Sequence, residues 1–544
     1  MGWANWSRGG KAGGSTGTAL HVRLALAGLG LLGAIAVGAT TIRSHDDNAA
    51  NLTKDVTPNP ALAAAAPATM PAPGPMRVGI NLFAVDAWGR QQVFSNMVAQ
   101  SEWFNSQGQG WTSFPTDQLD ALGWVRYLKP GQTAFLRLAL PAAPFQPAAV
   151  MCSFQGQGDV DAGGVAELRN RGPQSFMLDL KPTGAEGDIA WIELAKTDPQ
   201  DPIRNIDCRL ADRPVDERYT PEFLSFVRQF KIIRFLDWQK INDNAPVNWD
   251  TRPTPRSASQ ASPGGVSIED MVDLANATST DPWFLVPYKA DPAYTRAFAR
   301  LVHDRLDPKR TVYVELSNEV WNSVFDVSSQ AQAEGVALGL AKGDPMRATM
   351  LRYAQKLRGT MRIWTEVFAD RPHQLVRVAS SQNAWPDLAG IILGDADTAH
   401  WIDALATAPY FGFDLDKYGP GDLDRIFAKA PSAMEQALNN AMIHRELAAR
   451  YGKRYITYEA GQHFVTKDMD LAYALQRDPR MGALYTDYLD QWKKRFGGDM
   501  VLFSSTAPIG TYGGWGLREY AGQPEEQAPK YHAVRRFLAE LNRS

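Results

Sequence analysis

The sequence is poor in cysteine and has no excess of one charge. Its 544 residues include only 2 Cys, which excludes a disulfide-rich scaffold and a cysteine-based zinc module. Lys and Arg number 56 and Asp and Glu number 59, so the formal net charge is −3. This balance does not favour a nucleic-acid-binding protein, which needs a concentrated basic face. The 8 His form no H-E-x-x-H pair, so we expect neither a metal nor a cofactor.

Motifs for nucleotide binding and serine hydrolysis are also missing. The chain has no Walker loop and no G-x-S-x-G elbow. Gly28, Gly30 and Gly33 do match G-x-G-x-x-G, but they lie inside an apolar run and not between a strand and a helix. We therefore reject a dinucleotide site. What the chain does have is 44 % apolar residues and 16 Trp, which suits a large core and also stacking against sugar rings.

The N-terminal region has the pattern of a targeting segment. No Asp or Glu precedes Asp46, and the run 24–42 is uncharged and mostly apolar. That length can span a bilayer, and the same pattern is typical of a signal peptide. We expect 1–45 to be a signal peptide or signal anchor and 46–75, rich in Ala and Pro, to be a linker. The chain would then be exported: secreted, periplasmic, or membrane-anchored and facing outward.

Beyond the linker, strand-like and helix-like segments alternate. Strand patterns are followed by helical patterns such as 294–306, 346–368, 433–451, 482–496 and 530–541. Eight such strands predict an α/β protein, a (β/α)8 TIM barrel built from 76–122 and 213–544. The strand candidates are 78–83, 231–238, 283–287, 311–317, 374–380, 404–410, 454–459 and 499–504.

The region 123–212 does not show this alternation of strand and helix patterns. Short strand-like runs separated by Gly, Pro and Asp, without a helical period, predict a small β-sandwich inserted after the first β/α unit. Both cysteines, Cys152 and Cys208, fall inside it. In an exported protein they are either bridged or two buried thiols, and the sequence leaves both possibilities open.

Two glutamates follow strand patterns at the end where a barrel carries its active site. Alternation along 311–317 places Tyr313, Glu315, Ser317 and Glu319 on one face, which we expect to point inward. Inward acids at the carboxyl end of a barrel strand face the active site.

The same reasoning applied to 454–459 points Tyr455, Thr457 and Glu459 inward. Glycoside hydrolysis needs two such carboxyls, one protonated for the leaving oxygen and one ionised to attack or to activate water. Asn318 can hydrogen-bond a sugar hydroxyl, and Tyr410 or Arg234 can keep Glu459 ionised.

These motifs resemble those of clan-A glycoside hydrolases, which are retaining enzymes on (β/α)8 barrels. The string Ser-Asn-Glu-Val-Trp-Asn, with Arg-Phe-Leu-Asp-Trp upstream, also resembles exported bacterial proteins loosely labelled cellulose-binding or hydrolase-like. The resemblance implies that Glu319, preceded by Asn318, is the acid/base and that Glu459 is the nucleophile. It further implies that Tyr410 and Arg234 lie near the nucleophile and that Trp515 forms a sugar platform.

Two positions depart from the clan pattern. Val320 stands where many members have Pro, and no histidine ends the third strand, where Pro287 and Tyr288 stand. Trp321 is a further candidate for lining a sugar cleft. Glu315 is a weaker rival for catalysis, because an ion-paired place in the barrel core suits it better.

The sequence thus predicts a retaining glycoside hydrolase that acts on a β-linked oligo- or polysaccharide. Its two carboxyls, of Glu319 and Glu459, should lie about 5–5.5 Å apart, against about 6.5–9.5 Å in an inverting enzyme. The alternative is a non-catalytic carbohydrate-binding envelope protein on a degenerate barrel. Carbohydrate is the expected partner in both cases.

Overall fold

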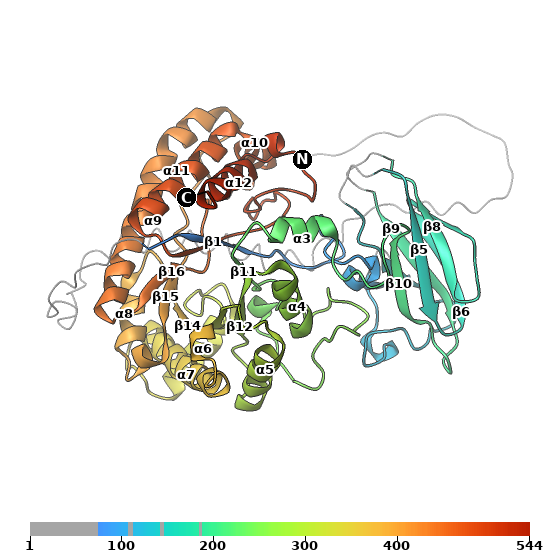
Figure 1. The fold of residues 1–544 in the computed structure, drawn as a ribbon, viewed down its shortest axis with the longest axis horizontal. Coiled ribbons are helices and arrows are strands. Elements are labelled where there is room, and N and C mark those ends of the chain that lie inside the picture. Colours follow the sequence, from blue (N-terminus) through green and yellow to red (C-terminus); the bar gives the residue numbers. More distant parts are fainter. Residues whose placement is uncertain (1–73, 107–111, 142–145, 184–187, 544) are drawn as a thin grey trace.

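The computed structural model describes residues 74–106, 112–141, 146–183 and 188–543 (Figure 1). The expected signal segment 1–45 lies outside the described residues, as does nearly all of the expected linker 46–75. Across the ranges that the structure describes, no helix combines the length and apolar character needed to cross a membrane.

A closed barrel of eight parallel strands forms the larger part of the molecule. Each strand pairs with the next along the chain, and β1 closes the ring against β17. The prediction of a (β/α)8 barrel is confirmed, and every expected barrel strand is present. The strands are β1 (Arg77–Asn81), β11 (Ile232–Arg234), β12 (Asp281–Val286), β13 (Val312–Leu316), β14 (Leu375–Ser380), β15 (Ala404–Thr407), β16 (Arg454–Thr457) and β17 (Asp499–Leu502).

Helices surround this barrel (Figure 1) and bury its outer face. Several begin at an acidic or hydroxyl cap followed by proline: Asp291 accepts the backbone N–H of Tyr294 before α5, and Asp344 does the same for Arg347 before α7. The helices are α3 (Pro221–Val227), α4 (Ile268–Thr278), α5 (Pro292–Arg305), α6 (Asp326–Ala337), α7 (Pro345–Val367), α8 (Pro386–Gly394), α9 (Leu423–Arg450), α10 (Met469–Arg477), α11 (Pro479–Arg495) and α12 (Pro529–Leu541).

Between β1 and β11 the chain leaves the barrel and forms two antiparallel sheets, which Figure 1 shows beside it. One sheet has the order β10-β5-β8-β7 and the other β3-β2-β4-β9-β6. The strands are β2 (Trp103–Asn105), β3 (Thr112–Ser113), β4 (Ala134–Arg137), β5 (Ala148–Gln155), β6 (Gly158–Gly164), β7 (Ala166–Arg169), β8 (Ser175–Leu180), β9 (Ala190–Thr197) and β10 (Arg204–Leu210).

The β part of this excursion begins earlier than the expected boundary at 123. Strand β2 pairs with β4, so residues from Trp103 onward belong to the five-stranded sheet. The first strands lack an apolar run of their own and are held by pairing with a later strand, a non-local contact that local patterns do not show. Cys152 and Cys208 sit opposite one another on β5 and β10 and form a disulfide.

Candidate active site

A buried arginine at the carboxyl end of β11 organises the mouth of the barrel. The Arg234 guanidinium is 0 % exposed, and each of its N–H groups donates a hydrogen bond. Nη1 reaches Asn81 at 3.0 Å and Glu459 at 2.8 Å, and Nη2 reaches Glu315 at 2.9 Å and Asn318 at 2.8 Å. Nε adds a second bond to Glu315 at 3.1 Å. A guanidinium held in this way positions side chains from three further strands, β1, β13 and β16.

Glu459 follows β16 and lies against this arginine. One of its carboxylate oxygens accepts from Arg234, and the other accepts the hydroxyl of Tyr410 at 2.9 Å. The residue is 5 % exposed, so only a small part of its surface contacts solvent. A charged donor and a neutral donor thus share the Glu459 carboxylate, which favours its ionised form.

Glu319, in the loop after β13, has neutral donors only. The Tyr458 hydroxyl donates to one oxygen at 2.9 Å, and the Asn322 amide donates to the other at 2.8 Å. No cation lies within ion-pair distance of Glu319 in the part of the chain that the structure describes. The contacts of Glu319 therefore disfavour its protonation less than the ion pair with Arg234 disfavours protonation of Glu459.

Burial raises the pKa of both glutamates, and the charge of Glu319 raises the pKa of Glu459 further. Two neighbouring carboxyls of this kind lose their protons in two separate steps. Since Arg234 stabilises the Glu459 carboxylate directly, we infer that the first proton leaves Glu459 and the last one stays on Glu319. The pair can therefore share one proton, with one carboxyl as the acid and the other as the base.

The expected alternation of side chains does not extend to either glutamate. Strand β13 ends at Leu316, and Ser317 and Glu319 then adopt positive φ values of 55° and 41°. Non-glycine residues rarely take this left-handed conformation outside sites where the surroundings impose it. A twisted loop, and not the strand register, therefore directs Glu319 into the mouth.

The orientation that we expected for β16 is wrong at Tyr455. Its ring packs against His444 of α9 and against Trp492 and Phe496 near α11, so it faces the helix layer. Glu459 still reaches the mouth, because β16 ends at Thr457 and the chain bends beyond it.

Tyr458 is the functional side chain that our sequence reasoning did not identify. Its ring lies 5.0 Å from the Arg234 guanidinium, and its hydroxyl bonds Glu319 while Glu459 is the next residue along the chain. Tyr458 lies beyond Thr457, the last residue of β16, so strand alternation could not have placed it.

The remaining predicted residues lie at different depths. Asn318 is 3 % exposed; its oxygen accepts from Arg234, and its amide nitrogen donates to Asn242 at 3.1 Å. Trp321 is 7 % exposed, with its ring centroid 6.2 Å from that of Tyr458. Both side chains therefore present little surface that a sugar could contact. Glu315 forms the ion pair with Arg234 that we expected for it.

Trp515 belongs to the long loop after β17 and remains half-buried. Its indole N–H donates to His463 at 3.3 Å, and its ring lies 5.9 Å from Phe503. Gly513 adopts φ 147°, and a Cβ there would stand 2.6 Å from the Trp515 ring, so only glycine allows the turn that seats the indole.

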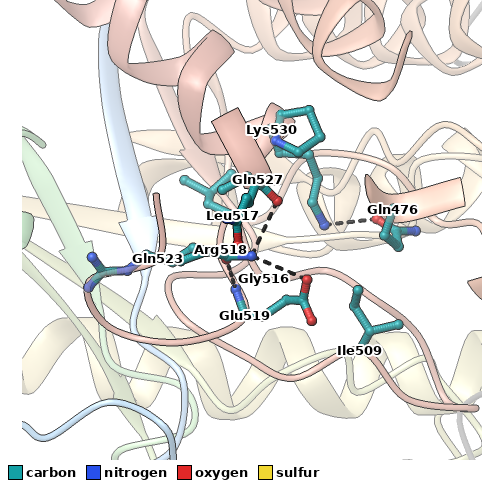
Figure 2. Close-up of a pocket in the computed structure, with 11 residues that line it drawn as sticks. Gln476, Ile509, Gly516, Leu517, Arg518, Glu519, Gln523, Gln527 and Lys530 are labelled. Carbon is teal, nitrogen blue, oxygen red and sulfur yellow. Dashed lines mark hydrogen bonds between the residues drawn. The ribbon is translucent and has the colours of Figure 1, made fainter. Parts of the chain in front are cut away.

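A buried lysine holds the backbone next to Trp515, and Figure 2 shows its ammonium group bonded to Gln476. The Lys530 ammonium, on α12, donates to Gln476 at 2.9 Å and to the carbonyl of Gly514, which also accepts from Gln462 at 2.9 Å. Within the described ranges no carboxylate lies at ion-pair distance from Lys530. Burial consequently lowers the pKa of Lys530 to about 7.

This lysine should make stability depend on pH. The unfolded lysine has a pKa of about 10.4, so between about pH 7 and pH 10 the unfolded state binds more protons and the free energy of unfolding rises with pH. Relative to Lys530→Met, the wild type should gain up to about 1.4 kcal/mol per pH unit in that window. Urea unfolding at three pH values measures this gain. Lys494→Met, on an exposed face of α11, is the control, and an equal pH dependence in Lys530→Met and wild type would contradict the assignment.

No known protein-family model matches the chain, and no curated protein matches it. Solved structures with a similar backbone include a GH51 arabinofuranosidase from Xanthomonas axonopodis pv. citri, 12 % identical over 60 % of this chain and 68 % of that chain, with a TM-score of 0.34. A GH128 (subgroup II) endo-β-1,3-glucanase from Pseudomonas viridiflava is 14 % identical over 58 % and 93 %, with a TM-score of 0.32.

An exo-β-agarase aligns over more of this chain, 86 %, but over only 62 % of its own length, at 9 % identity and a TM-score of 0.36. Likeness at this level assigns no family and no activity. The function has to be argued from the side chains at the mouth of the barrel.

Proposed function

We propose that the protein is a retaining glycoside hydrolase that cleaves a β-linked oligo- or polysaccharide. The observation that carries the proposal is the unequal environment of two carboxyls at the same barrel mouth. Glu459 accepts hydrogen bonds from a guanidinium and a phenol, whereas Glu319 accepts only from a phenol and an amide. One carboxyl poised as an anion and one as an acid is the arrangement that glycosyl transfer to an enzyme carboxylate requires.

In the first step, the Glu459 carboxylate attacks the anomeric carbon and the bond to the leaving oxygen breaks. That oxygen takes the proton of Glu319, so the leaving group departs as an alcohol and Glu319 becomes a carboxylate. Arg234, buried beside Glu459, stabilises its anion before attack and again when the ester breaks.

In the second step, Glu319 removes a proton from water while the water oxygen attacks the anomeric carbon. The glycosyl–Glu459 bond breaks, and both carboxyls return to their starting states. Two inversions at one carbon give net retention of configuration. The half-buried Trp515 is our candidate for stacking on a sugar ring.

The test is a substrate panel followed by product stereochemistry. Purified full-length protein is incubated with β-glucans, mannans, xylans and aryl glycosides, and the first anomer released is identified by proton NMR. We expect the β-anomer to appear first. Initial release of the α-anomer would contradict the mechanism, and tight sugar binding without hydrolysis would favour a carbohydrate-binding protein instead.

The pH profile of kcat/KM should distinguish the two carboxyls. The hydroxyl of Tyr458 lowers the pKa of Glu319 by donating to it, so Tyr458→Phe should raise that pKa and move the alkaline limb to higher pH by about one unit. Tyr410→Phe is the matched variant: it removes the donor to Glu459, raises its pKa and should move the acidic limb upward instead. A shift of the acidic limb in Tyr458→Phe would mean that the roles are reversed.

We further propose that the protein acts outside the cytoplasm, as its N-terminal sequence predicts. The Cys152–Cys208 disulfide supports this, because structural disulfides persist mainly in oxidising compartments. Fractionation of the producing cells, with electrophoresis under reducing and non-reducing conditions, tests it. Reduced protein in the cytoplasmic fraction would contradict the proposal.

A further inference from the structure

A tryptophan and an arginine meet where the insert touches the mouth of the barrel. Trp88 lies in the loop after β1, and Arg137 ends β4 of the insert. The guanidinium carbon lies 3.9 Å from the centroid of the Trp88 ring, so the cation covers one face of the indole. The ring edge meets Phe104 of β2 with centroids 6.1 Å apart. Trp88 nevertheless remains 48 % exposed, which leaves a large aromatic surface in contact with solvent.

Arg137 is an unusual group to find in such a place. The residue is only 8 % exposed, yet its guanidinium forms no hydrogen bond and no ion pair with the residues that the structure describes, and its Nε is fully buried. Burial lowers the pKa of Arg137 to about 10, so the group is still a cation at neutral pH. Buried polar groups are normally hydrogen-bonded, and an exception calls for a specific reason.

Two carboxylates lie near the Arg137 guanidinium without forming an ion pair with it. The charges of Asp86 and Glu102 both act on the pKa of Arg137, although burial has the larger effect on it, and neither carboxylate comes within ion-pair distance. Asp86 is 6 % exposed and accepts the backbone N–H of Trp88 at 2.7 Å through one oxygen. Glu102 makes no side-chain hydrogen bond within the described ranges. The Arg137 donors and the carboxylate acceptors of Asp86 and Glu102 thus lie near the exposed Trp88 indole without bonding to one another.

This junction belongs to the same mouth as the two glutamates. Asp237, just beyond β11, has a pKa that burial raises to about 6 and that the charges of Arg234 and Asp86 also influence. The carboxyl of Asp237 is therefore within electrostatic reach of both the arginine of the glutamate site and the carboxylate of the junction. Asp86 also raises the pKa of Tyr512, second to burial, and the Tyr512 ring lies 6.4 Å from that of Trp515.

We propose that Trp88, Arg137, Asp86 and Glu102 form a distal subsite that binds an uncharged sugar residue of the substrate chain. The sugar ring stacks on the exposed part of Trp88, its hydroxyl oxygens accept from Arg137, and its hydroxyl protons go to Asp86 and Glu102. A hydroxyl is both donor and acceptor, so neighbouring hydroxyls can satisfy the separated groups together. A sugar carboxylate would gain the charges of Arg137 and Lys240 but would meet those of Asp86 and Glu102, and it offers no donor to these two carboxylates.

This inference rests on the proposed function and extends it: the insert becomes a substrate-binding element that favours long neutral chains over short ones. The subsite should contribute to the affinity for substrate and little to the rate of bond cleavage, because it lies away from the anomeric carbon. Its loss should therefore appear in KM, and more strongly for a polymer than for an aryl monoglycoside of the same sugar.

The experiment compares kcat/KM of full-length variants on the best neutral polysaccharide and on the matching aryl monoglycoside. Trp88→Ala and Arg137→Gln should each lower the polymer-to-monoglycoside ratio by about 10-fold or more, mainly through KM. Trp401→Ala is the matched control, because Arg362 stacks on it at 4.8 Å but it precedes β15, at the opposite end of the barrel. That variant should leave the ratio unchanged. Since Trp88 is largely exposed, its variant should fold even where Arg137→Gln does not.

Calorimetric binding of neutral and uronic-acid oligosaccharides to Glu459→Gln separates this inference from the proposed function. Weaker neutral-sugar binding on adding Trp88→Ala supports the subsite even where no substrate is hydrolysed. Hydrolysis with an unchanged ratio in both variants, or tighter binding of uronic-acid chains than of neutral ones, would overturn the subsite and leave the proposed hydrolase intact.

Discussion

Glu459→Ala should reduce turnover on every substrate by about 10⁵-fold or more, because no other carboxylate can form the glycosyl-enzyme from that side of the ring. Glu315, the other carboxylate on Arg234, keeps its ion pair and is 0 % exposed, so it cannot substitute. The loss should affect aryl glycosides and natural chains alike, since both use the same nucleophile. Steady-state rates on both substrates measure it.

Azide provides the sharper test of this assignment. A small anion that enters the space left by the Glu459 side chain can attack the anomeric carbon once, so Glu459→Ala with azide and an activated aryl glycoside should yield a glycosyl azide of inverted configuration. Glu435→Ala is the control, because Glu435 pairs with Arg495 at 2.8 Å on the outer helices. Wild-type rates in Glu459→Ala, with the fold intact by circular dichroism, would exclude Glu459 as nucleophile.

Glu319→Ala should impair catalysis in a way that depends on the leaving group. Without a proton donor, a sugar leaving group departs about 10²- to 10⁴-fold more slowly, whereas an activated aryl group needs little protonation. Hydrolysis of the glycosyl-enzyme would then limit the rate on aryl substrates, giving a burst of released phenol. A Brønsted series of aryl glycosides, with stopped-flow detection of the burst, measures both effects.

Azide should act differently on this second variant. It attacks the glycosyl-enzyme without a general base, so it should accelerate Glu319→Ala and give a glycosyl azide of retained configuration. Glu319→Ala should remain folded, because it removes one hydrogen bond each from Tyr458 and Asn322 and breaks no ion pair. Equal losses on all leaving groups in Glu319→Ala would show that Glu319 is not the acid.

The barrel could be predicted because its strands are short apolar runs bounded by polar turns. Strand β12, for example, is buried along its whole length, and its residues from Trp283 to Val286 form a continuous apolar segment in the sequence. The number and order of such segments imply the barrel, since consecutive parallel strands joined by helices usually lie side by side.

Orientation beyond the strand ends was not predictable in the same way. Alternation holds only while the backbone is extended, and β13 and β16 end before Glu319 and Glu459. The left-handed turn at Ser317 and Glu319 depends on the surrounding loops, and the outward ring of Tyr455 depends on space between α9 and α11. Strands β2 and β3 likewise exist through pairing with distant residues.

The sequence by itself determined the fold class and the order of the barrel strands, because burial of apolar runs is a local property of the chain. Only the tertiary structure decided which carboxyl meets Arg234 and which meets neutral donors, and therefore where the proton of the pair resides. It also decided that Arg137 of the insert stacks on Trp88 of the barrel. Contacts between residues far apart in the chain set these electrostatic environments, and no local pattern encodes them.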